Sequence, residues 1–238
     1  MKYFSIGMII TIGLFVVSVY GISTTSAYAQ EQSQAVVKAD VPDIGFQWAF
    51  GVLDPKDKSK LISITRDTVL RTGDEIKMMV NLTKECYVYV FHQGARGEVN
   101  LLFPYKMQQF QKDYVLEKNY YIPPGRAWIV LDKEVGKEVF FIIASTERLL
   151  DLEAKASTYL SSEDAKKQEL ASDLVSEIRN VRKRYSNFST IAEKPIAIGG
   201  NIRGTEKVEG ARRPDVANIA TEIKAKTFYS KTITIDHK

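Results

Sequence analysis

Residues 70–105 constrain the fold of this chain more than any other stretch, because their apolar pattern predicts three consecutive strands joined by turns. The first strand has one apolar face, which carries Ile76, Met78 and Val80. The second strand, residues 86–91, is apolar on both faces, which is typical of a strand covered from above and below. Gly73 permits the positive φ of a tight turn, and Pro104 ends the third strand. We therefore expect this stretch to be the centre of a β-sheet domain.

The flanking segments supply further strands to the same domain. Alternating or apolar runs predict strands at residues 46–52, 61–65, 120–122, 127–131, 139–144 and 227–236. The runs at 127–131 and 139–144 are expected to form a hairpin across residues 132–137. The polar residues 106–118 predict a loop across one end of the sheet. Because the last strand needs a sheet to pair with, we expect the C-terminus to return to the upstream sheet.

At residue 145 the period of the apolar pattern changes from that of a strand to that of a helix. The first predicted helix has apolar residues at helical spacing, namely Leu149, Leu152, Ala156 and Leu160. Ser161 with Asp164 predicts the N-terminal cap of a second helix, whose apolar stripe is Leu170, Leu174, Ile178 and Val181. The sequence therefore predicts a mainly β fold, an antiparallel β-sandwich with an inserted two-helix hairpin at about residues 147–185, α+β overall. The chain from residue 186 to the last strand is expected to be irregular.

The first 29 residues have the features of a signal peptide. Lys2 gives the positive start, residues 4–20 are almost wholly apolar, and Ala27 and Ala29 have the spacing that signal peptidase accepts. Residues 30–45 are polar and predict a flexible leader, which leaves residues 46–238 as one domain. We expect export to the periplasm or the extracellular space, with no membrane span after cleavage. The alternative is a tether by an uncleaved N-terminal helix, because about 17 apolar residues approach the length that spans a bilayer.

Charge and cysteine usage narrow the classes of partner. The formal net charge is +4, and removal of residues 1–29 takes away one lysine and no acid, which leaves +3. This bias is too weak to indicate a nucleic-acid partner. Cys86 is the only cysteine, so an internal disulfide is excluded and stability must come from a packed core. Because Cys86 lies far from the cleavage site, a lipoprotein anchor is excluded as well.

No constellation of residues predicts catalysis, a cofactor or a metal. His92 and His237 are the only histidines, and neither has Cys, Asp or Glu partners at the spacing of a metal site or a catalytic triad. Cys86 lies in a predicted buried strand, where cysteine behaves as a small apolar residue. The glycine-rich residues 199–204 lack the Lys-Ser/Thr pair of a phosphate-binding loop.

The candidates for ligand binding lie near the ends of the predicted strands, where function often resides. Exposed aromatic rings around the 106–118 loop would stack on sugar or peptide, whereas rings inside strands are expected in the core. The ligand-binding candidates are His92, Arg96, Tyr105, Phe110, Tyr114, Tyr120 and Tyr121. A cluster of basic residues lies in the last turns of the second predicted helix. These residues either bind an anionic surface or stabilise the helix through its dipole. The members of the cluster are Arg179, Arg182, Lys183 and Arg184.

Five sequence blocks follow one another in order: residues 70–74 (LRTGD), 86–91 (CYVYVF), 101–105 (LLFPY), 121–124 (YIPP) and 144–149 (ASTERL). Together they resemble the bacterial domain of unknown function 4384 family over about residues 46–152. The closing residues 228–235 (FYSKTITI) are similar to the tail of its exported members. Members are extracytoplasmic or fused to signalling and peptidase modules, so the resemblance implies an accessory or sensing role. The family brings no established catalytic residues.

From export, aromatic-rich loops and the lack of a catalytic constellation, we expect a non-catalytic envelope module that binds a protein or glycan partner. One alternative is a periplasmic hydrolase that uses His92 with a carboxylate such as Glu98 or Asp132. Another alternative is a structural subunit of an envelope assembly. No cofactor and no nucleic-acid partner are expected.

Overall fold

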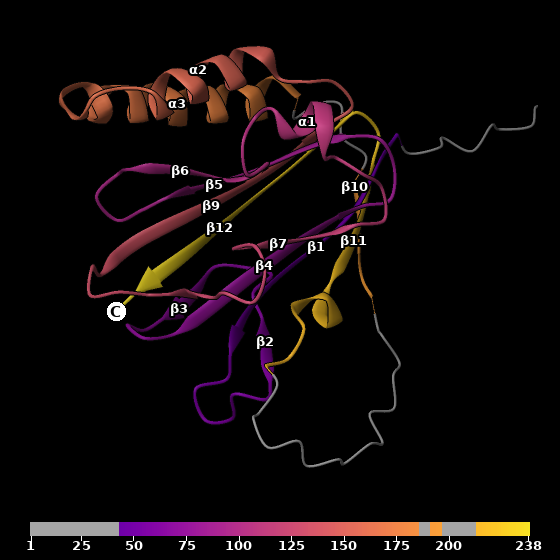
Figure 1. The fold of residues 1–238 in the computed structure, drawn as a ribbon, viewed down its shortest axis with the longest axis vertical. Helices are drawn as coiled ribbons and strands as arrows, with labels where there is room; N and C mark the ends of the chain where they lie inside the picture. The colour runs from indigo at the N-terminus through magenta and orange to yellow at the C-terminus, as the bar shows by residue number, and fades with distance from the viewer. Residues whose placement is uncertain (1–42, 186–190, 197–212) are drawn as a thin grey trace, which may run out of the picture. The chain divides into compact units, whose positions relative to one another are not determined.

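Two β-sheets stack face to face, and two helices cover the outer face of one of them (Figure 1). The computed structural model describes residues 43–185, 191–196 and 213–238, all of which belong to the unit Asp40–Lys238. The predicted signal peptide, most of the leader and the glycine-rich residues 199–204 lie outside the described residues. In the described part of the chain, no helix has the length and apolar character needed to cross a membrane.

The first sheet is antiparallel throughout and has the strand order β10–β11–β1–β4–β7, with β2 paired to β1 and β8 paired to β4. The strands are β1 (Ile44–Leu53), β2 (Leu61–Ser63), β4 (Glu75–Leu82), β7 (Asn119–Ile122), β8 (Ile129–Val130), β10 (Ile191–Pro195) and β11 (Thr221–Ala225). β1 begins two residues before the expected start of the domain. It pairs with β4 along residues 46–52, so the first predicted strand lies beside the first strand of the 70–105 stretch.

The second sheet has the order β3–β12–β9–β5–β6. Its strands are β3 (Thr68–Leu70), β5 (Tyr87–Gln93), β6 (Val99–Phe103), β9 (Gly136–Ser145) and β12 (Phe228–His237). All neighbours are antiparallel except β12 and β3, which are parallel. The C-terminal strand therefore returns to an upstream sheet, as predicted. The prediction of a β-rich α+β fold is confirmed.

Strand β5 shows why the two-sided apolar pattern was informative. Its Val88 and Val90 belong to the core between the two sheets, whereas Tyr89 and Phe91 belong to a second core between this sheet and the helices. A strand that is buried on both sides needs apolar residues at every position. Cys86, just before β5, lies in the core between the sheets, as predicted.

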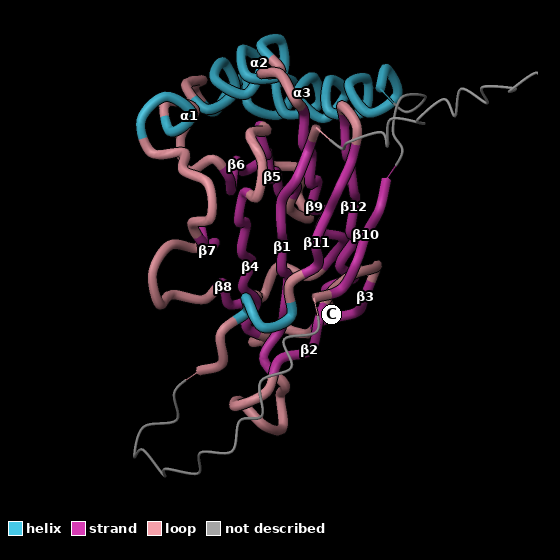
Figure 2. Tube along the Cα trace, turned by 90° about the vertical axis from the view of Figure 1, so that its right-hand side faces the viewer, coloured by secondary structure: helices cyan, strands magenta, loops and turns pink. Residues whose placement is uncertain are grey.

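The helical insertion is confirmed as α2 (Leu150–Leu160) and α3 (Asp164–Tyr185), which lie side by side over the second sheet (Figure 2). The buried stripe of α2 includes Leu152, Ala156 and Tyr159, whereas the predicted Leu160 is 52% exposed. Ser161 does not cap α3. Instead it ends α2, where its hydroxyl donates to the carbonyl oxygen of Ser157 at 2.9 Å.

Three further predictions, about the segments between and after the main strands, were wrong. The runs at 127–131 and 139–144 do not form a hairpin, because β8 pairs with β4 in the first sheet and β9 belongs to the second. Residues 106–118 are not wholly irregular, since they contain the short helix α1 (Gln109–Lys112). The segment after residue 186 contains two strands, β10 and β11, and the 3₁₀ helix η2 (Val216–Ile219).

Candidate functional site

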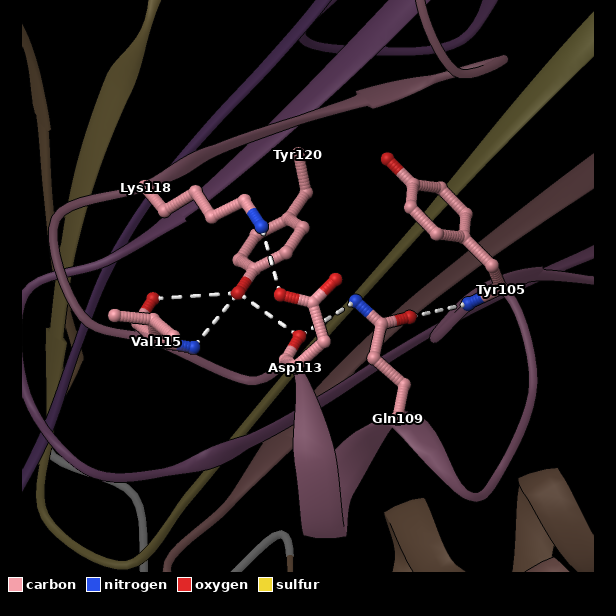
Figure 3. Close-up of polar contacts among 6 residues, drawn as sticks. All are labelled: Tyr105, Gln109, Asp113, Val115, Lys118 and Tyr120. Carbon is pink, nitrogen blue, oxygen red and sulfur yellow. Dashed lines mark hydrogen bonds and ion pairs between the residues drawn. The ribbon is translucent and has the colours of Figure 1, made fainter.

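The loop of residues 106–118 is held in place by a buried glutamine (Figure 3). The side-chain oxygen of Gln109 accepts a hydrogen bond from the backbone N–H of Tyr105 at 2.8 Å, and its nitrogen donates to the carbonyl oxygen of Asp113 at 3.2 Å. The oxygen and the nitrogen of this side-chain amide thus each have a hydrogen-bond partner in the backbone of residues 105–113. The single turn of α1 is fixed by side-chain bonds as well as by its backbone.

Tyr120 anchors the other half of the loop. Its buried hydroxyl accepts from the backbone N–H of Val115 at 2.7 Å and donates to the carbonyl oxygen of Asp113 at 3.0 Å (Figure 3). Lys118 pairs with the Asp113 carboxylate at 2.7 Å and lies over the Tyr120 ring, 5.1 Å from its centre. These contacts fix the loop on β7 and occupy both the lysine and the carboxylate.

Three of the predicted aromatic candidates build the loop from inside. Phe110 and Tyr114 pack edge-to-face with ring centres 4.9 Å apart, and Tyr120 stacks on Tyr114. The Tyr114 hydroxyl accepts from the backbone N–H of Val88 at 2.8 Å, and burial raises the pKa of Tyr114 far above its usual value. The two tyrosine hydroxyls are therefore used by the protein itself, while the half-buried rings of Phe110 and Tyr114 also line an open cavity beside β5.

Tyr105 is the aromatic candidate that the fold leaves exposed. Its side chain is 38% exposed, while its hydroxyl donates to the carbonyl oxygen of Tyr121 at 2.7 Å. Partial burial raises the pKa of Tyr105 to about 12, so the hydroxyl stays protonated near neutral pH. Tyr121 is only partly exposed, and its own hydroxyl donates to the carboxylate of Asp215 at 2.9 Å.

Three open cavities surround α1. One, of about 340 Å³, lies between Tyr105–Gln108 and the C-terminal end of α2 and is lined by Leu101, Met107 and Leu160 among others. A second, of about 500 Å³, is lined by Tyr105, Lys106, Gln108, Gln109, Lys112 and Asp113. A third, of about 370 Å³, lies on the side of β5 and includes Tyr87 and Leu116. We call the surface formed by Tyr105, Lys106, Met107, Gln108, Lys112 and Leu160 the Tyr105 surface.

His92 and Arg96 lie on other parts of the fold. His92 shares a carboxylate with the only other histidine of the chain, since its Nε2 lies 2.9 Å from one oxygen of Glu138 and the Nδ1 of His237 lies 3.0 Å from the other. The Nε2 of His237 contacts the hydroxyl of Thr72 at 3.2 Å. Arg96 forms an exposed ion pair with Glu134 at 2.7 Å. The carboxylate partner of His92 is thus Glu138, not Glu98 or Asp132.

This histidine network joins three neighbouring strands, β5, β9 and β12. Because an ionised carboxylate only accepts hydrogen bonds, both imidazoles donate to Glu138. The bond from His92 is the main cause that holds the pKa of Glu138 below its usual value, against the opposing effect of burial. His237 is fully buried, whereas His92 is 17% exposed at its side chain. Within the described residues, no group of three His, Cys, Asp or Glu side chains is arranged to hold a metal ion.

In a comparison with known families, residues 69–148 match the family described as "Domain of unknown function (DUF4384)". These residues belong to the DUF4384 family. The match lies within the stretch over which the sequence blocks showed the resemblance. No curated protein and no solved structure matches the chain.

The DUF4384 residues extend from β3 to β9 and contribute strands to both sheets. They contain the whole loop around α1, as well as Thr72, His92 and Glu138. The flanking chain supplies the strands that lie outside the match, which are β1, β2, β10, β11 and β12. His237 is therefore a contribution of the flanking chain to a network whose other members belong to the DUF4384 domain.

One lysine of the DUF4384 domain is buried, although it lies between two apolar positions of strand β4, Ile76 and Met78. Lys77 on β4 donates to the carbonyl oxygens of Pro123, Gly125 and Ala127 at 3.3, 2.9 and 2.6 Å. Its ammonium group also lies over the ring of Trp128, 5.7 Å from the ring centre. Burial lowers the pKa of Lys77. The three donors of this ammonium are used to shape the β7–β8 turn.

The basic cluster of α3 is partly used by the fold. Arg182 donates to the hydroxyl of Ser230 on β12 at 3.4 Å, and burial lowers the pKa of Arg182. Arg184 lies 3.8 Å from the carboxylate of Glu177 on the same helix. The Arg182 contact thus attaches the end of α3 to the second sheet, whereas the Arg184 contact lies within the helix.

Proposed function

We propose that this protein is a non-catalytic, exported module of the bacterial envelope that binds a protein or glycan partner through the Tyr105 surface. The observation that carries the proposal is the placement of Tyr105, whose exposed ring lines two open cavities while its hydroxyl is fixed on Tyr121. A ring held in this way presents a large contact area with little conformational entropy left to lose on binding.

The rigidity of the loop supports the same proposal. Gln109 and Tyr120 bind the loop backbone through buried side chains, so the loop keeps one geometry before a partner arrives. Binding sites with such support lose less free energy to ordering when the ligand binds. The loop also lies within the DUF4384 match, so every member of the Tyr105 surface except Leu160 belongs to the matched residues.

Export is the second part of the proposal. It rests on the basic start, the apolar run and the Ala-x-Ala spacing of residues 1–29. N-terminal sequencing of protein recovered from the producing cells is expected to begin at Gln30. Recovery of Met1 would instead support the tethered form with an uncleaved helix.

The partner can be sought with a photo-crosslinking residue placed at Gln108, which is exposed on the Tyr105 surface. In intact cells we expect discrete adducts from this position and their loss when Tyr105 is replaced by Ala. The same crosslinker at Lys56, in the exposed turn between β1 and β2, serves as the control. Identical adducts from both positions would contradict the assignment of the surface.

A second candidate function, hydrolysis, is favoured by the pairing of His92 with Glu138. With Nε2–H donating to the carboxylate, Nδ1 of His92 is the atom that would take a proton from water. The resulting hydroxide would attack an ester carbonyl, and the alkoxide that leaves would receive the proton from His92. Replacement of His92 by Ala should then abolish hydrolysis of chromogenic esters, and equal rates for wild type and variant would remove this candidate.

A further inference from the structure

We propose that the ligand of the Tyr105 surface is a peptide segment in which a large apolar side chain stands next to carboxylates. This inference rests on the proposed function and names the chemistry of the partner. It is based on the side chains that line the two cavities meeting at Tyr105, since one includes Leu101, Met107 and Leu160, and the other includes Lys106 and Lys112.

The smaller cavity suits an apolar side chain. Leu101 of β6, Met107 and Leu160 of α2 line it, and Leu160 is one of the most exposed large apolar residues among those described. Methionine adapts to ligands of different shape because its side chain is flexible and polarizable. An exposed leucine beside a cavity favours a partner that removes its side chain from water.

The larger cavity suits carboxylates. Lys106 and Lys112 line it, and neither forms an ion pair within the described part of the chain. The acidic residue in this lining, Asp113, is already paired with Lys118 at 2.7 Å. The cavity therefore offers two unmatched positive charges, and a partner with negative charge would be complementary to it.

The two cavities belong to one site because Tyr105, Lys106 and Gln108 line both of them. A ligand that crosses the Tyr105 ring therefore reaches Met107 and Leu160 in the smaller cavity and Lys112 in the larger one, with Lys106 beside both. This arrangement favours a peptide over a sugar. A peptide can place one large apolar side chain against Leu101, Met107 and Leu160, whereas a sugar ring would turn mainly hydroxyl groups toward these side chains.

The test uses the mature chain, residues 30–238, and fluorescein-labelled peptides of eight residues followed by fluorescence anisotropy. One peptide carries a phenylalanine flanked by glutamates, the second a phenylalanine flanked by lysines, and the third a serine flanked by glutamates. We expect the first to bind at least about tenfold more tightly than the other two, with an affinity that falls as salt rises. Equal affinity of the first and second peptides would overturn the inference.

Matched variants place the ligand on this surface. The double variant Lys106→Glu/Lys112→Glu should weaken the first peptide by at least about tenfold. The control Lys56→Glu/Lys133→Glu makes the same change in net charge at two exposed lysines outside the site, and it should change the affinity less than about twofold. Leu160→Asp, at an exposed position, should also weaken binding without unfolding α2. Equal losses in both double variants would contradict the proposal.

The same experiments distinguish a wrong class of ligand from a surface that binds no partner. If adducts from Gln108 in cells persist in the Lys106→Glu/Lys112→Glu variant, the surface binds a partner but not through acidic groups. If oligogalacturonate binds in a Tyr105-dependent manner and none of the peptides does, the ligand is a glycan and the peptide assignment is wrong. If no adduct forms at all, the proposed function itself fails.

Discussion

At the scale of single residues, Lys77 shows how one buried charge shapes a turn. Its ammonium group satisfies three carbonyl oxygens of the segment that joins β7 to β8. Buried polar groups are costly when they lose their partners, because water does not fully replace them. The lysine thus fixes residues that are distant in sequence, which its position in an alternating pattern does not reveal.

Replacement of Lys77 by Met keeps the length of the side chain and removes the ammonium group. We expect the free energy of unfolding to fall by about 1–3 kcal/mol, because the carbonyl oxygens lose a charged donor. Urea denaturation of both proteins measures this change. Lys137→Met, at an exposed position of β9, is the matched control and should stay within about 0.5 kcal/mol of wild type. Equal effects of the two changes would contradict the role of Lys77.

Cys86 gives a second prediction at this scale. Burial raises the pKa of its thiol to about 12, so almost no thiolate is present at pH 8. Because the thiolate is the reactive form, Ellman's reagent should label the native protein at least about a hundredfold more slowly than the urea-unfolded chain. The difference in rate is read from absorbance. Similar rates in the two states would mean that the thiol is accessible in the folded protein.

The candidate site could be predicted only in part at the scale of residues. The sequence pointed to the aromatic residues around the 106–118 loop, and Tyr105 is indeed exposed there. It did not reveal that Tyr114 and Tyr120 use their hydroxyls to bind backbone N–H groups, because this depends on tertiary contacts. Nor did it reveal Glu138, which meets His92 only through the register of β5 with β9.

At the scale of elements, prediction succeeded where one apolar pattern continued over many residues. It failed where the sequence had to indicate which of the two sheets a strand joins. The helices α2 and α3 follow from a sustained period of 3.6 residues. By contrast, β8 and the adjacent β9 are both extended, and nothing local in their sequence indicates that they join different sheets. Strands β10 and β11 were missed because charged residues interrupt their short patterns.

The docking of α2 on the edge of the second sheet provides a prediction for this scale. The hydroxyl of Tyr159 accepts a hydrogen bond from the backbone N–H of Val99 at 2.9 Å, and Val99 begins β6. Tyr159→Phe removes this acceptor and keeps the ring, so we expect a loss of about 1 kcal/mol in the free energy of unfolding. Hydrogen exchange should show faster exchange of the Val99 amide.

A matched control for this change is Tyr185→Phe. The ring of Tyr185 stacks on Phe228 with centres 4.8 Å apart, and that contact does not need the hydroxyl. This variant should leave both the stability and the exchange of Val99 unchanged. Unaltered exchange of Val99 in Tyr159→Phe would show that the bond does not hold α2 to β6.

At the scale of the whole described unit, the ends of the chain complete the fold. Strands β1 and β12 come from opposite ends of the sequence, and each lies beside a strand of the DUF4384 domain, β4 or β9. The alternation of residues 227–236 predicted the last strand, but its place between β9 and β3 depends on contacts across most of the chain. The histidine network is a side-chain connection at this junction, because it joins His237 of β12 to Glu138 of β9.

This connection makes the stability of the unit depend on pH. The pKa of Glu138 is lower in the folded protein than in the unfolded chain, so its carboxylate stabilises the fold above the unfolded pKa of about 4.5. That contribution is lost as the pH falls through the lower, folded value. Glu138→Gln should therefore reduce the free energy of unfolding by about 1–3 kcal/mol at pH 7. The difference in free energy of unfolding between wild type and this variant should become smaller below pH 4.5.

Urea denaturation at pH 7 and at several values below pH 4.5 measures this difference. The matched control is Glu98→Gln. Glu98 is exposed in the turn after β5, and the hydrogen bond of His92 goes to Glu138 instead. Its effect should stay within about 0.5 kcal/mol at every pH. If wild type and Glu138→Gln differ in free energy of unfolding by the same amount at every pH, the loss comes from packing. If the difference becomes smaller in acid, the loss comes from the carboxylate that His92 and His237 share.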